Sequence, residues 1–103
     1  MNKLIYFISL SLVAQLAFAK GMELIEDTIL WRSSSLPGYN LTVSNCSTCH
    51  SAQYAEYQPP NSNPAFWKAQ VSRMKKIFNA PIPDEDVPAI VEYLNQTYGD
   101  NRK

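Results

Sequence analysis

The feature that most constrains this chain is the clustering of its sulfur and imidazole side chains. The 103 residues include two cysteines and one histidine, and all three lie in the run Cys46-Ser47-Thr48-Cys49-His50. A disulfide between cysteines three positions apart closes a very short loop, which removes little entropy from the unfolded chain. The thiols are therefore expected to do something other than cross-link the chain.

The spacing Cys-x-x-Cys-His is that of a covalent attachment site for c-type haem. Two thiols three positions apart on one helical turn can each form a thioether with a haem vinyl group. The next residue, His50, then lies where an imidazole nitrogen can bind the iron. The sequence thus predicts one covalently bound haem c, held by Cys46 and Cys49 and ligated by His50.

Two other kinds of site share part of this pattern. A zinc site requires four ligands, and the sequence contains no further cysteine or histidine to complete one. A dithiol oxidoreductase requires a strand that leads into its Cys-x-x-Cys helix, and no such pattern precedes Cys46. Haem attachment is therefore favoured over both.

Met74 is the residue predicted to be the second axial ligand. It lies in the segment Asn63–Asn79, which is expected to be helical because four apolar side chains recur at helical spacing on one face, namely Trp67, Val71, Met74 and Phe78. Met74 is the one member of this set with a lone pair to offer iron. There are two alternatives: the iron is ligated by Lys75 or Lys76, or its sixth position is open.

The axial ligands decide between electron transfer and catalysis. An iron that is bound by both His50 and Met74 has no vacant position for a substrate, and a thioether ligand favours the reduced state. We therefore expect an electron-transfer protein without catalytic residues. An open site would instead permit ligand binding or peroxide chemistry, as in a haem enzyme or sensor.

The N-terminal residues have the pattern of an export signal. Lys3 precedes an uncharged stretch at residues 4–19, and Ala17-Phe18-Ala19 supplies small residues at a cleavage site. The alternative, a retained membrane anchor, is disfavoured because a spanning helix needs about 20 apolar residues. The chain is expected to be exported, with cleavage near Ala19 and no stable membrane span afterwards.

The remaining sequence predicts a single small helical domain. With 46% hydrophobic residues, 17% charged residues and a formal net charge of zero, the chain is a typical globular domain and not a nucleic-acid-binding arm. The predicted fold is all-α: a small helical domain at residues 41–103 around the haem, preceded by an irregular extension at residues 20–40.

Local signals predict the elements of this domain. Thr42 or Ser44 is expected to cap the helix that carries the attachment run, and Leu36–Tyr39 is expected to be a turn. A final helix is expected to run to about Tyr98, with Pro88 in its first turn. Its predicted buried side chains are Val87, Ile90, Val91 and Leu94. Trp31 is expected to pack against the domain without a chemical role.

These residues resemble the monohaem cytochrome c subunit of bacterial sulfite:cytochrome c oxidoreductases. The resemblance covers most of residues 41–99. It is carried by the attachment run with Ser51-Ala52, and by Gln58-Pro59-Pro60, Phe66-Trp67, Val71, Met74, Ala80-Pro81-Ile82, Ile90, Tyr93-Leu94 and Tyr98-Gly99. The attachment run is common to all c-type cytochromes, so the other segments carry the more specific likeness.

The resemblance implies a partner and a pathway for electrons. A molybdenum-cofactor subunit would oxidise sulfite and pass electrons singly to the haem, which would deliver them to a downstream cytochrome c or an oxidase. It implies Cys46 and Cys49 as attachment points and His50 and Met74 as axial ligands. It also implies a cytochrome c-like fold for residues 41–103 and a periplasmic location. The alternative is a periplasmic electron carrier that serves another dehydrogenase.

Four basic residues suggest how such a partner is recognised. A positive rim beside the haem edge would attract an acidic partner and accelerate association at low salt. The residues are Lys68, Arg73, Lys75 and Lys76. The alternative is an ordinary solvated helix face.

Overall fold

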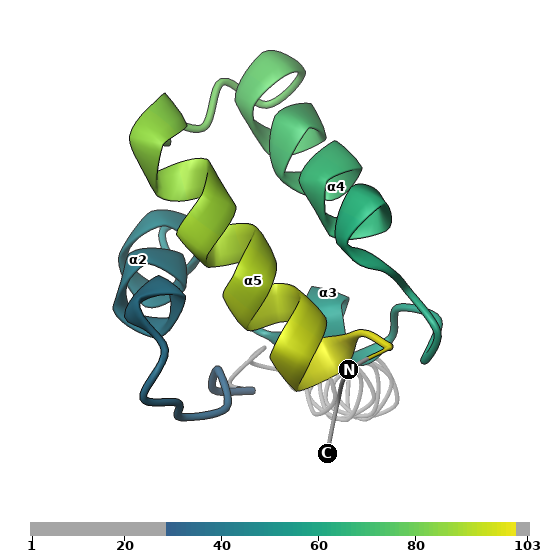
Figure 1. The fold of residues 1–103 in the computed structure, drawn as a ribbon. Helices are drawn as coiled ribbons and strands as arrows, with labels where there is room; N and C mark the ends of the chain where they lie inside the picture. Colours follow the sequence, from purple (N-terminus) through teal and green to yellow (C-terminus); the bar gives the residue numbers. More distant parts are fainter. Residues whose placement is uncertain (1–28, 101–103) are drawn as a thin grey trace, which may run out of the picture.

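The computed structural model describes residues 29–100, which form helices and no strand (Figure 1). The elements are α2 (Pro37–Cys46), α3 (Gln53–Glu56), α4 (Pro64–Lys76), the 3-10 helix η1 (Asp84–Asp86) and α5 (Val87–Tyr98). The all-α prediction is therefore confirmed for these residues. The predicted signal at residues 1–19 lies outside the described part of the chain, as do residues 20–28 of the predicted extension.

Helix α2 begins earlier than the sequence analysis expects. Pro37 occupies the first helical turn, where a missing backbone N–H costs nothing, and the Leu36 N–H donates to Ser34 Oγ at 3.1 Å. The predicted turn at Leu36–Tyr39 is therefore wrong, because residues 37–39 are helical. Position 41, the predicted start of the haem domain, consequently lies inside a helix.

The predicted caps of this helix are also wrong. Thr42 and Ser44 both lie within α2, and Thr42 is fully buried. The Ser44 hydroxyl donates back to the Asn40 carbonyl at 2.9 Å, a bond typical of serine inside a helix.

Gly38 allows α2 to cross α5 at close range (Figure 1). A Cβ atom at this position would lie 1.9 Å from the Ala89 carbonyl oxygen and 2.8 Å from Tyr93 Cβ. No side chain fits in that space, so the backbone of α2 approaches the backbone of α5 directly. The crossing places the C-terminal end of α2, where the attachment run begins, against the core.

Helix α4 is confirmed but is shorter than predicted. Asn63 caps its start by accepting a hydrogen bond from the Phe66 N–H at 2.9 Å, and the helix ends at Lys76. Trp67 and Val71 are buried as expected. Phe78 lies beyond the helix and is 65% exposed, so its predicted place on the apolar face is wrong.

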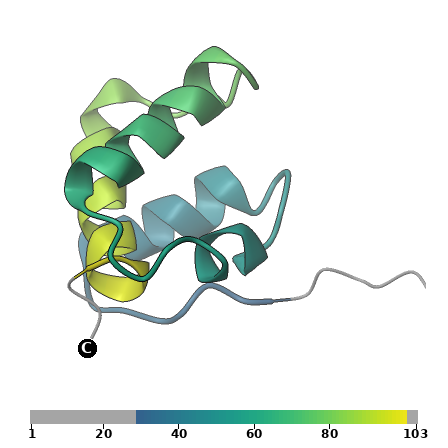
Figure 2. The same ribbon diagram turned by 90° about the vertical axis from the view of Figure 1, so that its right-hand side faces the viewer.

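Helix α5 is the centre of the molecule, with α2 and α4 packed against it (Figures 1 and 2). Its predicted features are confirmed: it ends at Tyr98, and Pro88 lies in its first turn. Ile90 and Leu94 are buried, and Val87 and Val91 pack at the edge of the core. Tyr93 and Tyr98, which the sequence analysis does not assign to the core, are almost completely buried as well.

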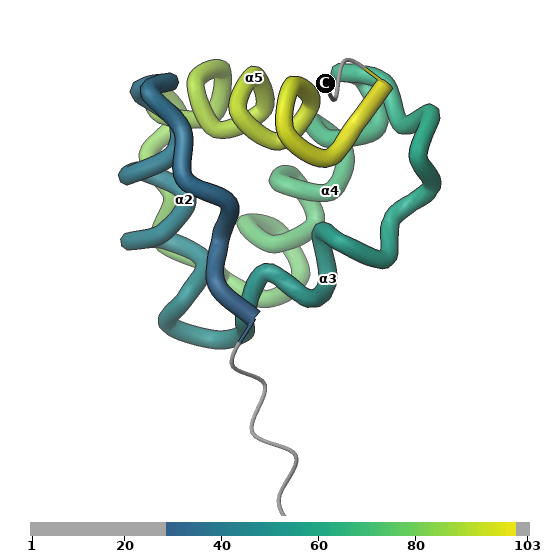
Figure 3. Tube along the Cα trace, turned by 90° about the horizontal axis from the view of Figure 1, so that it is seen from below, coloured from purple at the N-terminus to yellow at the C-terminus, as the bar shows by residue number. Residues whose placement is uncertain are grey.

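Residues 29–36 form an extended segment, which we call the N-terminal strap. It crosses the underside of the molecule from the start of α2 to the vicinity of α3 (Figure 3). Trp31 is its one strongly buried side chain, with 8% of its surface exposed. Within the described residues, no helix is long and apolar enough to cross a membrane.

Candidate functional site

The attachment run lies at the C-terminal end of α2 and continues its curvature. After Cys46 the Ser47 N–H donates to the Val43 carbonyl at 3.2 Å. The N–H groups of Cys49 and His50 both donate to the Cys46 carbonyl, at 3.2 and 3.3 Å. These short-range bonds wind the chain as a turn, so the two cysteines and His50 lie close together on one piece of backbone.

The two thiols differ in their environment. Both are free, but Cys46 is half-buried at the edge of the core and Cys49 is exposed. Burial raises the pKa of the Cys46 thiol to about 11, and the neighbouring Cys49 contributes in the same direction. Cys46 is therefore protonated at neutral pH, which disfavours oxidation and metal binding at this sulfur.

His50 is held in one orientation by its own loop. Its Nδ1 lies 2.8 Å from the Ser51 carbonyl oxygen. Because a carbonyl oxygen only accepts hydrogen bonds, Nδ1 is the donor here, and in the neutral imidazole the lone pair is then on Nε2. Imidazoles that ligate metals are commonly oriented by such a bond from the second ring nitrogen. The ring also packs edge-to-face on Tyr54, with 5.0 Å between centroids.

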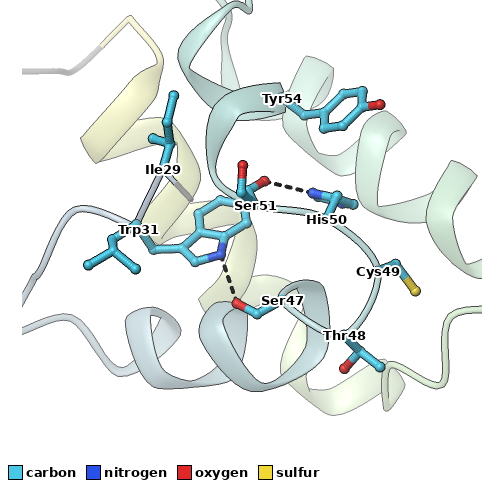
Figure 4. Close-up of a pocket in the computed structure, with 9 residues that line it drawn as sticks. Ile29, Trp31, Ser47, Thr48, Cys49, His50, Ser51 and Tyr54 are labelled. Carbon is cyan, nitrogen blue, oxygen red and sulfur yellow. Dashed lines mark hydrogen bonds between the residues drawn. The ribbon is translucent and has the colours of Figure 1, made fainter. Parts of the chain in front are cut away.

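An open pocket of about 560 Å³ adjoins this loop (Figure 4). Its volume lies within the range of roughly 300–1,000 Å³ that is usual for cofactor and ligand sites. The loop and the strap line it together, through Ile29, Leu30, Trp31, Ser47, Thr48, Cys49, His50, Ser51 and Tyr54. Two of the predicted site residues, Cys49 and His50, thus face a common space.

Met74 occupies a different part of the site region. It is half-buried near the end of α4, packs against the hydrophobic core, and accepts the Ala80 N–H on its carbonyl at 3.0 Å. It is not among the residues that line the pocket. The described contacts place Cys46, Cys49 and His50 together and do not join Met74 to His50, so its role as a ligand stays a prediction.

The chemistry of these groups fits a covalently bound haem. Two free thiols on one turn, an imidazole with an available lone pair and a partly apolar pocket are the groups that attachment requires. Among residues 29–100, no three histidine, cysteine, aspartate or glutamate side chains come together as a metal site.

The basic residues do not form one free cluster. Lys75 makes an ion pair and a hydrogen bond with Asp84. The hydrogen bond and the positive charge of Lys75 both lower the pKa of the Asp84 carboxyl. Lys68, Arg73 and Lys76 are exposed. Lys75 is consequently compensated by an acidic neighbour, and the positive charge available to a partner lies on the other three side chains.

The site also contains residues to which the sequence analysis gives no role. Trp31 and Tyr54 both pack on the His50 ring, although Trp31 is far from it in the sequence. An extended segment has no helical period, so the sequence marks Trp31 only by the size of its side chain and by the arginine that follows it.

In comparisons with known proteins, no family model and no curated protein matches this chain.

Proposed function

We propose that this chain is a periplasmic electron-transfer protein that carries one covalently attached haem c and is not itself an enzyme. The observation that carries the proposal is the turn after α2. There, two free thiols and an imidazole with an available Nε2 lone pair lie on one short piece of backbone. This set serves haem attachment and fits neither a structural disulfide nor a zinc site.

In this proposal each residue has a distinct task. Cys46 and Cys49 hold the haem by thioether bonds, and His50 is the proximal axial ligand, with Met74 as the second. When bound, the haem supplies a one-electron ferric/ferrous couple. The Ser51 carbonyl orients the imidazole, and Cys46 joins the start of the attachment turn to the edge of the core. A thioether ligand at Met74 would raise the reduction potential and leave no open position for a substrate.

The proposed electron donor is a molybdenum-cofactor sulfite-oxidising subunit, with a downstream cytochrome c or an oxidase as acceptor. The supporting observation is the resemblance of residues 41–99 to the cytochrome subunit of sulfite dehydrogenases. The exposed cations Lys68, Arg73 and Lys76 give the surface near α4 a charge that suits an acidic partner. The predicted export signal would bring the chain to the periplasm, the compartment proposed for such a dehydrogenase.

The test is to export the full chain from a host that contains a cytochrome c maturation system. We expect red protein whose mass equals that of the signal-cleaved chain plus haem, because each thiol adds across a vinyl group without losing an atom. The pyridine haemochrome spectrum should be that of two thioethers. It should shift to longer wavelength in Cys49→Ala, which leaves one.

Cys46→Ala/Cys49→Ala is the matched control, because it removes both attachment points and keeps His50. Colourless wild-type protein with both thiols open to alkylation would refute haem attachment. If haem is bound but its ferrous form readily binds carbon monoxide, the iron has an open coordination position. That result would refute an electron-transfer site with two protein ligands and favour a haem sensor or enzyme. Failure to accept electrons from a sulfite dehydrogenase would refute only the partner.

A further inference from the structure

The N-terminal strap contacts the attachment turn at points that determine the orientation of His50. The Trp31 indole N–H donates to Ser47 Oγ at 3.1 Å, inside the Cys-x-x-Cys run (Figure 4). The Trp31 ring also lies 6.2 Å from the His50 ring, measured between centroids, at an interplanar angle of 54°. Trp31 therefore contacts the run on both sides of Cys49.

The strap also binds the peptide group that orients the imidazole. The Ser51 carbonyl, which accepts the bond from His50 Nδ1, belongs to the same planar peptide unit as the Ala52 N–H. That N–H donates to the Ile29 carbonyl at 3.0 Å. A shift of the strap at Ile29 would thus rotate the peptide group on which the histidine depends.

The strap itself is fixed to the core directly after Trp31. The Arg32 N–H donates to the Tyr98 hydroxyl at 2.9 Å, and the Tyr93 hydroxyl donates to the Arg32 carbonyl at 2.7 Å. Burial raises the pKa of Tyr93 far above its usual range, so this hydroxyl stays a donor at all ordinary pH values. The backbone at Arg32 is therefore held between two buried tyrosines of α5.

The Arg32 side chain adds a second attachment. Its guanidinium binds both carboxylate oxygens of Glu56 on α3, at 2.8 and 2.5 Å, and lies 5.0 Å from the centre of the Tyr98 ring. A two-bond contact of this kind fixes the orientation of both groups. The strap consequently links the attachment turn to α3 and α5, and the Trp31 ring has little freedom to move away from His50.

We propose that Trp31 is a positioning residue that sets the orientation of the His50 imidazole plane, acting through the ring contact and through Ser47. This inference rests on the proposed haem attachment. The indole N–H bond to Ser47 fixes the turn relative to the strap, and the ring restricts rotation of the imidazole. The sequence analysis assigns Trp31 only to packing.

The experiment uses haem-loaded protein and compares Trp31→Phe, Trp31→Leu and Ser47→Ala with wild type. In ferric low-spin protein, the spread of the proton resonances of the haem methyl groups depends on the orientation of the axial imidazole. We expect this spread to change in all three variants, most in Trp31→Leu, with a parallel shift in reduction potential. The double variant Trp31→Phe/Ser47→Ala should change this spread no more than whichever of its two single variants has the larger effect. Each of the two substitutions removes the same hydrogen bond between Trp31 and Ser47, so their effects should not add.

Val91→Ala is the matched control. Val91 packs against the edge of the core from α5, takes part in none of the hydrogen bonds described for the strap or the attachment turn, and does not line the pocket. The substitution should lower thermal stability and leave the methyl resonances unchanged. If the Trp31 variants behave like Val91→Ala while haem stays attached, the positioning role is wrong and the proposed function stands. If wild-type protein acquires no haem, both are wrong. Ser47 is exposed, so Ser47→Ala tests the inference even if Trp31→Leu does not fold.

Discussion

The two cysteines of one attachment turn have unequal chemistry, and the difference can be measured at single residues. In the haem-free chain, burial holds the pKa of Cys46 at about 11, whereas Cys49 is exposed. Iodoacetamide reacts with the thiolate, so at pH 8 we expect Cys49 to be alkylated first and Cys46 at least about tenfold more slowly. The Cys46 rate should rise steeply towards pH 11. Peptide mass spectrometry resolves the two sites.

The raised pKa of Cys46 also makes the stability of the haem-free protein depend on pH. A folded-state pKa raised from 9.0 to about 11 contributes stability below pH 9 that is lost as pH rises towards 11. Thioether formation removes the titrating thiol, so this alkaline loss should be absent from the haem-loaded protein. In urea the two alkylation rates should converge. Equal rates in native buffer would contradict the burial of Cys46.

Met74 is the residue whose role depends most on the haem. A methionine at the edge of a core is ordinarily a packing residue, and its replacement by leucine keeps volume and apolar character at a cost below about 1.5 kcal/mol. If Met74 binds iron, Met74→Leu should abolish the near-infrared methionine-to-iron band and lower the reduction potential. A variant that keeps the band and the potential would assign Met74 to packing alone.

At the scale of elements, the α2–α5 crossing depends on the absence of one side chain. In Gly38→Ala the new methyl group would meet the Ala89 carbonyl carbon at 2.6 Å, and backbone cannot move aside as a flexible side chain does. We expect a loss of about 1–3 kcal/mol in unfolding free energy, despite the better helix propensity of alanine. Chemical denaturation of the haem-loaded protein measures the loss.

Asn40→Ala is the matched control, because Asn40 is an exposed position on the same helix. Its effect should stay within about 0.5 kcal/mol, as for most surface substitutions. A Gly38→Ala variant as stable as wild type would show that the two helices separate easily, and that the crossing does not hold the attachment turn in place.

The elements that could be predicted are those whose signals are local. The apolar spacing in α4 and α5 and the place of Pro88 are visible along a few turns of chain, and the structure agrees with them. Pro37-Gly38 suggests a turn when read locally. In the structure Gly38 instead lies within α2 and against α5, which follows about fifty positions later, and no local pattern reports that contact.

The same reasoning separates the two parts of the candidate site. The attachment run is a fixed local spacing, so Cys46, Cys49 and His50 could be identified from the sequence. The strap could not, because its bonds join Trp31 to Ser47 and Arg32 to Tyr98, residues far apart in the chain. An extended segment has no helical period, so its contacts become visible only when the fold is known.

For the whole molecule, a net charge near zero still permits an uneven distribution of charge over the surface. The salt dependence of the electron-transfer rate should detect it. The formal net charge of the 103 residues is zero, and removal of Lys3 with the predicted signal changes it to −1 (eight basic against nine acidic residues), so a strong salt dependence would arise mainly from local charge near the point of electron transfer. Lys75 is compensated by Asp84, while Arg73 and Lys76 remain exposed on α4. Oxidation of the ferrous protein by anionic ferricyanide should therefore slow as salt increases. Oxidation by a cationic cobalt(III) complex should accelerate, because salt screens repulsion as well as attraction.

Two double variants test whether the exposed cations of α4 cause this salt dependence. Arg73→Gln/Lys76→Gln should reduce the ferricyanide rate about 2- to 10-fold at low ionic strength and flatten its salt dependence. Lys75→Gln/Asp84→Asn removes an equal number of charged groups without changing net charge, so its salt dependence should match that of wild type. If both double variants behave alike in stopped-flow measurements, electrons leave the haem at a point away from α4. An acidic partner would then have to dock on another face of the molecule.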